Sequence, residues 1–277
     1  MSLPCQQQLI GFPPGLLGDV PLRMPVIGET NDWMALAKPA GIGLRAYPWD
    51  HGVPHMDAAL NRQLQAGKPE LLKRGATLFG STYYLDPAIS GVALFAKHRA
   101  SLSRLRNMVG SAELRFRFLL VTTAGAAAGA QELIADAPLL AHRTKPKMIP
   151  STANGKKAQT QFRRLAESGS GWALWEGLTT FIRPHQIRAH AAVHGLSILG
   201  DVLYGGPEVP LLRELLPNKR GPGTGFPVFD GVALHLHELT LPESVSSQAT
   251  SIHLRAQLPR HLCVMLQRMQ LKIPDQA

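Results

Sequence analysis

Short apolar runs with the length of β-strands recur along this chain, and turn residues bound many of them. Lys38-Pro39-Ala40-Gly41 stops the first run, and RFRFLLV begins with phenylalanine on one face and arginine on the other, as a half-buried strand requires. We predict strands at WMALA (33–37), VALFA (92–96), RFRFLLV (115–121), KAQTQF (157–162), WALWEGLTT (172–180) and VALHLHELTL (232–241).

Fewer segments show the spacing of amphipathic helices. Met56, Leu60 and Leu64 recur at helical intervals before Gly67, and a second apolar face follows at 99–109. Pro184 opens a third helix that Gly195 closes, and residues 259–271 form a fourth. Strands outnumber helices and several connections are short. We therefore predict an α+β fold in which helices flank a mixed, mostly antiparallel β-sheet.

Charge and cysteine content narrow the classes of function. The 277 residues carry 29 Lys and Arg against 19 Asp and Glu, a net charge of +10 that favours a polyanionic partner such as nucleic acid. The two cysteines, Cys5 and Cys263, lie near opposite ends and indicate reduced thiols in a cytosolic protein. The first twenty residues do not have the pattern of a signal peptide, and we expect no membrane span.

Four segments carry the chemistry: KPAG (38–41), YYLDPAISG (83–91), RPHQIRAHAAVHGLSILGDVLYGG (183–206) and ALHLHEL (233–239). In this order they resemble the RluA-like RNA pseudouridine synthases. The resemblance runs from about residue 33 to 258, so we expect an N-terminal extension at 1–32 and a catalytic domain at 33–277. It implies an enzyme that isomerises uridine to pseudouridine in structured RNA, either rRNA or tRNA.

The resemblance places the family's catalytic aspartate at Asp86. Taken alone, an Asp before Pro87 more often begins a turn. The implied reaction needs one well-placed carboxylate, because breaking the C–N glycosidic bond leaves an electron-deficient anomeric carbon. The detached uracil must then rotate and rejoin through C5 in a site that excludes water. These steps require neither a cofactor nor a metal.

The helix near residue 188 supplies the other expected site residues. The resemblance implies that Arg188 pairs with Asp86, because a guanidinium favours the charged carboxylate and fixes its direction; a solvated helix arginine is the alternative. Arg183 can hold a phosphate or pack structurally. His185 and Gln186 belong to the matching HQIRAH segment, and we expect them to contribute to substrate binding.

Three histidines, His185, His190 and His194, permit a metal interpretation because the last two are spaced i, i+4. No acidic or cysteine ligands cluster with them in the sequence, and the family match explains the first two without metal. We therefore predict no metal site.

Several residues depart from the family pattern. Tyr83-Tyr84 replace His-Arg, and Tyr84 offers a ring that can stack in the space of a displaced base. Pro87, Ala88 and Ile89 replace polar residues, and Ile182-Arg183-Pro184 replaces Gly-Arg-Thr. The family's strand tyrosine falls on Phe116 or Arg117, and a one-residue change of register exchanges the two faces. Phe116 keeps stacking without the hydroxyl, whereas Arg117 offers a cation over the base.

Two classes of function remain open. One is a pseudouridine synthase with a variant site; the other is an RNA-binding relative with weakened or lost isomerisation. Residues 1–32 show no recognisable S4-type RNA-binding domain, so we expect RNA to bind the basic surface of the catalytic domain. The expected partner is rRNA or tRNA, and the expected state is a cytoplasmic monomer.

Overall fold

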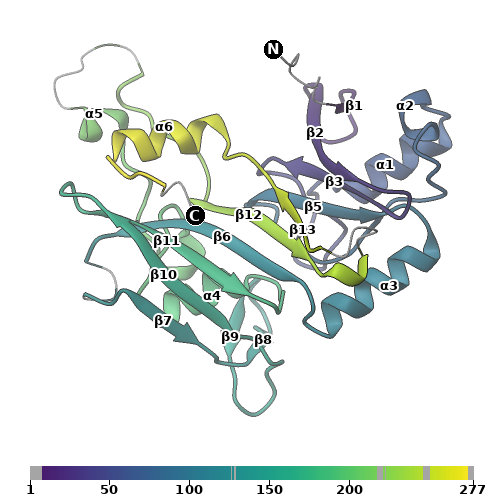
Figure 1. Cartoon of the computed structure of the whole chain (residues 1–277). Coiled ribbons are helices and arrows are strands. Elements are labelled where there is room, and N and C mark those ends of the chain that lie inside the picture. The colour runs from purple at the N-terminus through teal and green to yellow at the C-terminus, as the bar shows by residue number, and fades with distance from the viewer. Residues whose placement is uncertain are drawn as a thin grey trace. The chain divides into compact units, whose positions relative to one another are not determined.

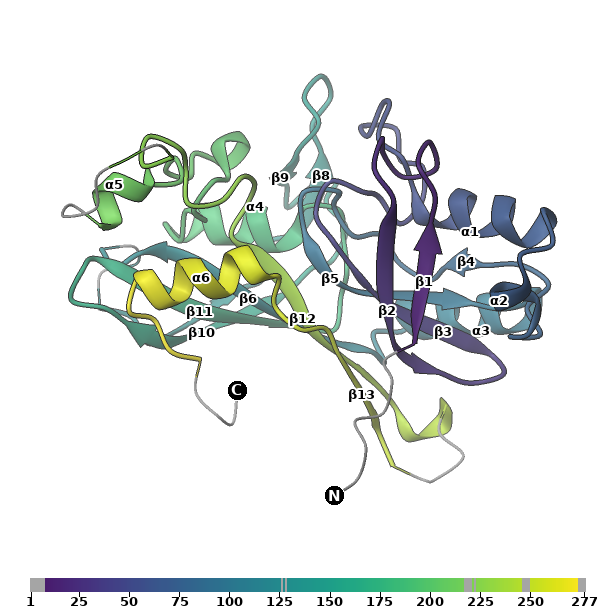
Figure 2. The same cartoon turned by 90° about the horizontal axis from the view of Figure 1, so that it is seen from above.

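The computed structural model describes residues 8–125, 127, 129–216, 221, 223–245 and 250–273. Cys5 lies outside these ranges, as do Lys219 and Arg220, a basic segment of the sequence that we expected to contact phosphates. The chain divides into two compact units, Met1–Leu114 with Glu238–Gln257, and Arg115–His237 with Leu258–Ala277 (Figures 1 and 2). This division concerns compactness, and the domain boundary at residue 33 stays a prediction.

Unit 1 is an antiparallel sheet with helices. Its elements are β1 (Leu9–Phe12), β2 (Leu22–Glu29), β3 (Trp33–Lys38), α1 (Met56–Gln65), α2 (Pro69–Leu72), β4 (Gly80–Ser81), β5 (Ser90–Ala96), α3 (Arg99–Gly110), the second half of β12 (Leu234–Leu241), the 3-10 turn Glu243–Val245 and β13 (Ile252–Arg255). The strands β1, β2, β3 and β5 pair in that order, and β4 also pairs with β5. The expected N-terminal extension therefore contributes two strands to this sheet.

Burial in unit 1 is centred on β5. All seven of its residues are buried, as expected for a strand covered on both faces. Helix α3 packs against β5, and its buried residues include Leu105 and Met108. The strand and helix predicted from residues 92–96 and 99–109 are confirmed.

Unit 2 contains the other sheet pairings. Its elements are β6 (Arg115–Thr123), β7 (Glu132–Ala135), β8 (Leu139–Ala141), β9 (Met148–Pro150), β10 (Thr160–Glu167), β11 (Trp172–Thr179), α4 (Gln186–Val193), the 3-10 turn Val202–Tyr204, α5 (Leu212–Leu215), the first half of β12 and α6 (Arg260–Arg268). Strands β6, β11, β10 and β7 pair antiparallel in that order, and β8 pairs with β9.

The two faces of these strands carry different helices. Leu119, Val121 and Leu174 pack with Met265 of α6 in one apolar cluster. On the opposite face, a Cβ on Gly177 would touch Ile187 of α4. The period-two alternation of β6 and β11 thus presents one apolar surface to each helix. The α+β, mostly antiparallel fold expected from the sequence is confirmed.

Several predicted boundaries were wrong, among them those of α4 and β10. The third helix begins at Gln186 rather than near Pro184, because His185 has φ +51° in the left-handed region. The strand predicted from residue 157 begins at Thr160. Gly195 does follow the helix with φ +71°, as its expected capping role requires.

Candidate active site

Asp86 lies in unit 1, in the loop that joins β4 to β5. It is 2% exposed. The amide of Ile89 donates to the carbonyl of Asp86 at 3.0 Å, which closes a turn around the Asp-Pro step. The hydroxyl of Tyr83 donates to the carbonyl of Val92 at 2.7 Å and ties the start of the loop to β5. These contacts hold a buried carboxylate in a defined backbone conformation.

Lys38 is a buried cation beneath this loop. It ends β3, is 2% exposed, and its Nζ donates to the carbonyls of Pro39 at 3.0 Å, Pro87 at 3.3 Å and Ile89 at 2.5 Å. Burial lowers the pKa of Lys38 to about 7, while the negative charges of Asp86 and Asp50 oppose that change. The lysine of KPAG therefore links the end of β3 to the residues that directly follow Asp86.

The glycine of KPAG makes a second link. Gly41 has φ +89°, a conformation that L side chains rarely adopt, and its amide donates to the carbonyl of Pro87 at 2.8 Å. Thus both ends of the 38–41 turn bind the loop that carries Asp86.

A second carboxylate and three aromatic rings accompany Asp86 in unit 1. The Tyr84 hydroxyl donates to Asp50 Oδ2 at 3.0 Å. The rings of Tyr47 and Tyr84 lie 4.5 Å apart between centroids, and Trp49 meets Tyr47 edge-on at 5.3 Å. Burial raises the pKa of Asp50, and the charge of Asp86 raises it further, against the hydrogen bond from Tyr84. No sequence pattern indicated Tyr47, Trp49 or Asp50, and Lys38 was expected only as part of the KPAG turn.

Arg188 lies on α4 in unit 2, where it forms a bidentate ion pair with Asp201. Its Nε and Nη2 donate to Asp201 Oδ2 and Oδ1 at 2.8 and 2.6 Å, and both side chains are at most 7% exposed. The turn that holds Asp201 needs Gly200, which has φ +81° and whose Cβ would lie 1.9 Å from the carbonyl oxygen of Gly231. From the sequence, Asp201 with Gly200 indicates a structural turn acid, and the family resemblance also allows it a supporting role.

Tyr204 contacts two of the predicted site residues of unit 2, His185 and Arg188. Its hydroxyl lies 3.1 Å from His185 Nδ1 and accepts from the amide of Met148 at 2.7 Å. The guanidinium of Arg188 lies 5.1 Å from the centre of the Tyr204 ring, and Lys147 Nζ lies 5.8 Å from it. His185 and Arg188 therefore share one aromatic neighbour.

Gln186 and Arg183 contact the backbone near β10. The Gln186 amide donates to the carbonyl of Gln159 at 3.0 Å and to the hydroxyl of Thr179 at 3.0 Å. Arg183 Nε donates to the carbonyl of Lys157 at 3.1 Å, and both cations lie within 6 Å of the Phe181 ring. The hydrogen bonds of Gln186 thus connect the start of α4 to neighbouring strands. Arg183 instead lies with Lys157 around the Phe181 ring.

The two candidates on β6 face opposite ways. Phe116 is fully buried. Arg117 Nε donates to Glu176 Oε2 at 2.7 Å, and Glu176 also pairs with Arg163. The alternation predicted from RFRF is confirmed.

His190, one of the three histidines considered as metal ligands, lies inside unit 2. His190 is buried, with its ring nitrogens 2.9 Å from Thr160 Oγ1 and the carbonyl of Ala137. Within the described ranges, no three His, Cys, Asp or Glu side chains group as metal ligands.

No helix in that part of the chain combines the length and apolar character that a membrane crossing requires.

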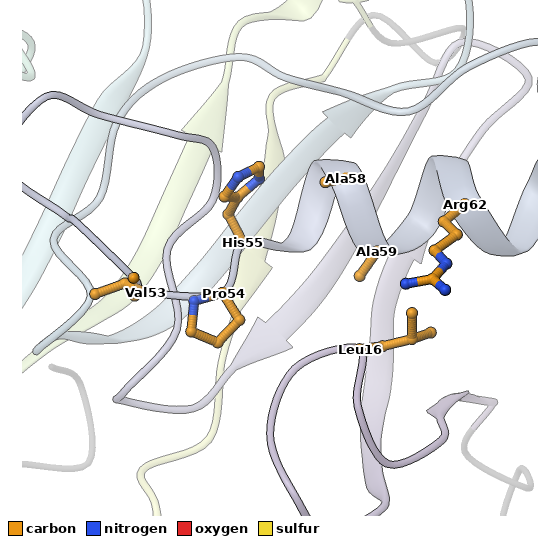
Figure 3. Close-up of a pocket in the computed structure, with 8 residues that line it drawn as sticks. Leu16, Val53, Pro54, His55, Ala58, Ala59 and Arg62 are labelled. Atoms are coloured by element: carbon orange, nitrogen blue, oxygen red, sulfur yellow. The ribbon is translucent and has the colours of Figure 1, made fainter.

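Unit 1 also contains an open cavity of about 340 Å³ between α1 and the segment that precedes it. Figure 3 shows Leu16, Val53, Pro54 and Ala59 along it, with the Arg62 side chain at one end. His55 and Arg62 add polar groups to this lining, and Gly52, two residues after Asp50, also belongs to it.

Sequence comparison identifies the family, although no family model matches the chain. A Synechocystis protein described as an uncharacterized RNA pseudouridine synthase is 30% identical over 257 residues, covering 88% of this chain and 76% of its own length. The chain belongs to the RNA pseudouridine synthase family. A second such Synechocystis protein is 27% identical, covering 91% of this chain and 71% of the relative. Ribosomal large subunit pseudouridine synthase D of Yersinia pestis is 27% identical over 68% of this chain and 55% of its own length.

Solved structures agree on the fold of this pseudouridine synthase family member. Human RNA pseudouridylate synthase domain containing 4 superposes with a TM-score of 0.66 at 19% identity, covering 90% of this chain and 94% of that one. Human RNA pseudouridylate synthase domain containing 1 gives a TM-score of 0.57 at 15% identity, covering 99% and 100%.

Each predicted site residue of this family member now has a described environment within its own unit. The pairing of Asp86 with Arg188 joins residues of different units and stays a prediction. The substrate contacts of Tyr84, Phe116, Arg117, Arg183, His185 and Gln186 also stay predictions.

Proposed function

We propose that this chain converts uridine to pseudouridine in structured RNA, either rRNA or tRNA, with Asp86 as its catalytic carboxylate and without a cofactor. One observation carries the proposal. Asp86 is buried in a loop that Lys38 and Gly41 bind from below, in a chain that belongs to the RNA pseudouridine synthase family. A turn-forming aspartate on the surface would need no such support.

The chemistry follows from the reacting bonds. The bond between C1′ of the ribose and N1 of the uracil breaks, and C1′ then bonds to C5. C5 loses a proton and N1 gains one, so the product is an isomer of the substrate. Asp86 supplies negative charge at C1′ as a nucleophile or as an electrostatic stabiliser. The surrounding burial limits access of water, which would otherwise capture the same carbon.

Arg188 is the proposed partner of Asp86. Its contact with Asp201 uses Nε and Nη2. Its Nη1 lies 3.5 Å from His185 Nε2. We keep Arg188 as the expected partner of Asp86 because a guanidinium can orient a carboxylate. Asp201 then acts as a positioning residue that sets the plane of the guanidinium.

The proposal is tested by incubating the purified chain with cellular RNA and mapping pseudouridine gained over an untreated control. Asp86→Asn keeps the volume of the side chain and removes its charge, so isomerisation should be abolished while RNA affinity is retained or slightly increased. Arg188→Ala should reduce both. Asp19→Asn, at an exposed position of unit 1, is the matched control and should retain activity. Equal isomerisation by the wild type and Asp86→Asn would contradict the mechanism.

The second candidate is an RNA-binding relative that has lost isomerisation. It is favoured by Phe116, which is buried and has no hydroxyl for proton transfer, and by Tyr84, whose hydroxyl is bonded to Asp50. RNA binding by the wild type without pseudouridine formation on a broad RNA panel would support this candidate. In either case we expect a cytoplasmic monomer that contacts phosphates through its basic side chains.

A further inference from the structure

The aromatic cluster beside the Asp86 loop consists of Tyr47, Trp49 and Tyr84. Tyr84 is 4% exposed, whereas Tyr47 and Trp49 are partly exposed. The buried ring packs against Tyr47, and Trp49 meets Tyr47 nearly at right angles. The cluster therefore has a fixed inner ring and two outer rings with accessible surface.

Asp50 fixes the inner ring. Its Oδ2 accepts the Tyr84 hydroxyl at 3.0 Å, and burial raises the pKa of Tyr84 so that the phenol stays protonated and donates. Asp50 also belongs to the same short segment as Tyr47 and Trp49. One hydrogen bond thus connects the segment that carries the outer rings to the chain two residues before Asp86.

We propose that Tyr47 and Trp49 form a stacking platform for an unpaired RNA base next to the uridine that Asp86 acts on, with Tyr84 and Asp50 as positioning residues. This inference rests on the proposed function. Aromatic side chains bind unstacked bases of any identity through their faces. Tyrosine and tryptophan rings provide such faces without adding charge.

The outer rings suit a base because their faces are uncharged. Asp50 and Asp86 raise the pKa of Tyr47 and Tyr84 in addition to burial, whereas the charge of Arg45 lowers that of Tyr47. Charges of both signs therefore lie beside the rings, and the contact that we assign to Tyr47 and Trp49 is stacking on a base rather than an ionic contact with phosphate.

The test compares two fluorescein-labelled hairpin RNAs by fluorescence anisotropy: one with an all-uridine loop, and one with the same stem and abasic sites in the loop. Each ring should contribute the stacking of one base, so Tyr47→Ala and Trp49→Ala should each weaken binding of the uridine loop by about 5- to 150-fold. Binding of the abasic hairpin should not change. Tyr47→Phe and Trp49→Phe should restore affinity, because each keeps an aromatic face.

Further variants separate this platform from a general loss of folding or charge. Phe226→Ala removes a 69% exposed ring in unit 2 and should leave both affinities unchanged. Tyr84→Phe removes the bond to Asp50 and should weaken binding of the uridine loop several-fold, whereas Asp50→Asn keeps an acceptor and should preserve it. The salt dependence of binding should be the same for Trp49→Ala and the wild type, because no phosphate contact is lost.

Two results would overturn the inference: unchanged affinity of Tyr47→Ala and Trp49→Ala for the uridine loop, or equal loss on both hairpins. Because these measurements report binding, they stand whether or not the chain isomerises uridine. Failure of the proposed function would instead appear as absent pseudouridine with the hairpin difference intact.

Discussion

Replacing Lys38 with methionine removes the buried cation that binds the Asp86 loop, and its effect should depend on pH in a defined direction. The pKa of this lysine falls from 10.5 to about 7 on folding, chiefly because of burial. Between these values the unfolded chain holds a proton that the folded chain has released. The free energy of unfolding of the wild type therefore rises with pH across this window.

The expected size follows from the linkage relation. One proton of difference changes the free energy of unfolding by about 1.4 kcal/mol per pH unit. Near pH 7 the folded lysine is only half protonated, so the gain between pH 7 and pH 9 is about 2 kcal/mol. Lys38→Met lacks this contribution. The wild type should thus gain about 2 kcal/mol over the variant across that range.

Urea unfolding of both proteins at several pH values between 7 and 9, followed by circular dichroism, measures this difference directly. Other titrating groups are shared by the two proteins and cancel in the comparison. Lys73→Met, at an exposed position of unit 1, controls for the loss of one positive charge. A difference between wild type and Lys38→Met that stays constant from pH 7 to pH 9, or that falls, would refute the reasoning.

Three further predictions concern stability and RNA binding. Asp201→Ala should lower the free energy of unfolding by about 3–5 kcal/mol in urea titrations, because it leaves a buried guanidinium without its carboxylate, whereas Asp19→Ala should change it little. Gly41→Ala should cost about 1–2 kcal/mol in the same assay, because φ is +89° there. RNA affinity should fall steeply as salt rises, and Lys157→Ala should reduce the slope of log K against log salt by about one; a salt-independent affinity would contradict the phosphate assignment.

The strongest periodic segments were predictable from the sequence because burial there dictates the residue pattern. VALFA became β5, which is buried throughout, and the helix after it has its apolar residues at helical spacing. The strands β1, β4, β7, β8, β9 and β13 were missed, because two to four residues carry too little periodicity to distinguish them from loops. The eight-residue strand β2 was also missed; it contains Pro25 and Gly28 and has one fully buried residue, so its pattern does not alternate. Local geometry also shifted α4, where His185 adopts a left-handed conformation that no pattern indicates.

The candidate site was predicted only from motifs. The LD-x-x-x-SG spacing places the expected catalytic aspartate at Asp86, and the HQIRAH segment places its expected partner at Arg188; both roles stay predictions. In the sequence, Lys38 resembles a lysine in a solvated turn. Only its hydrogen bonds to the carbonyls of Pro87 and Ile89 show that it is buried. Asp50 lies in an irregular segment without periodicity, so its bond to Tyr84 depends on a fold that sequence spacing alone does not give.

The side chains around the Asp86 loop include charges of both signs. Asp50 and Asp86 favour the protonated form of Lys38, and Arg45 is a further cation beside Tyr47. The region becomes more negative when Lys38 loses its proton, and negative charge would stabilise the positive charge that we expect to develop at C1′. We expect phosphate contacts to come from cations such as Lys157 and Arg183, which lie around Phe181. The base contacts proposed for Tyr47 and Trp49 and the expected phosphate contacts therefore use different side chains, so mutations can separate them.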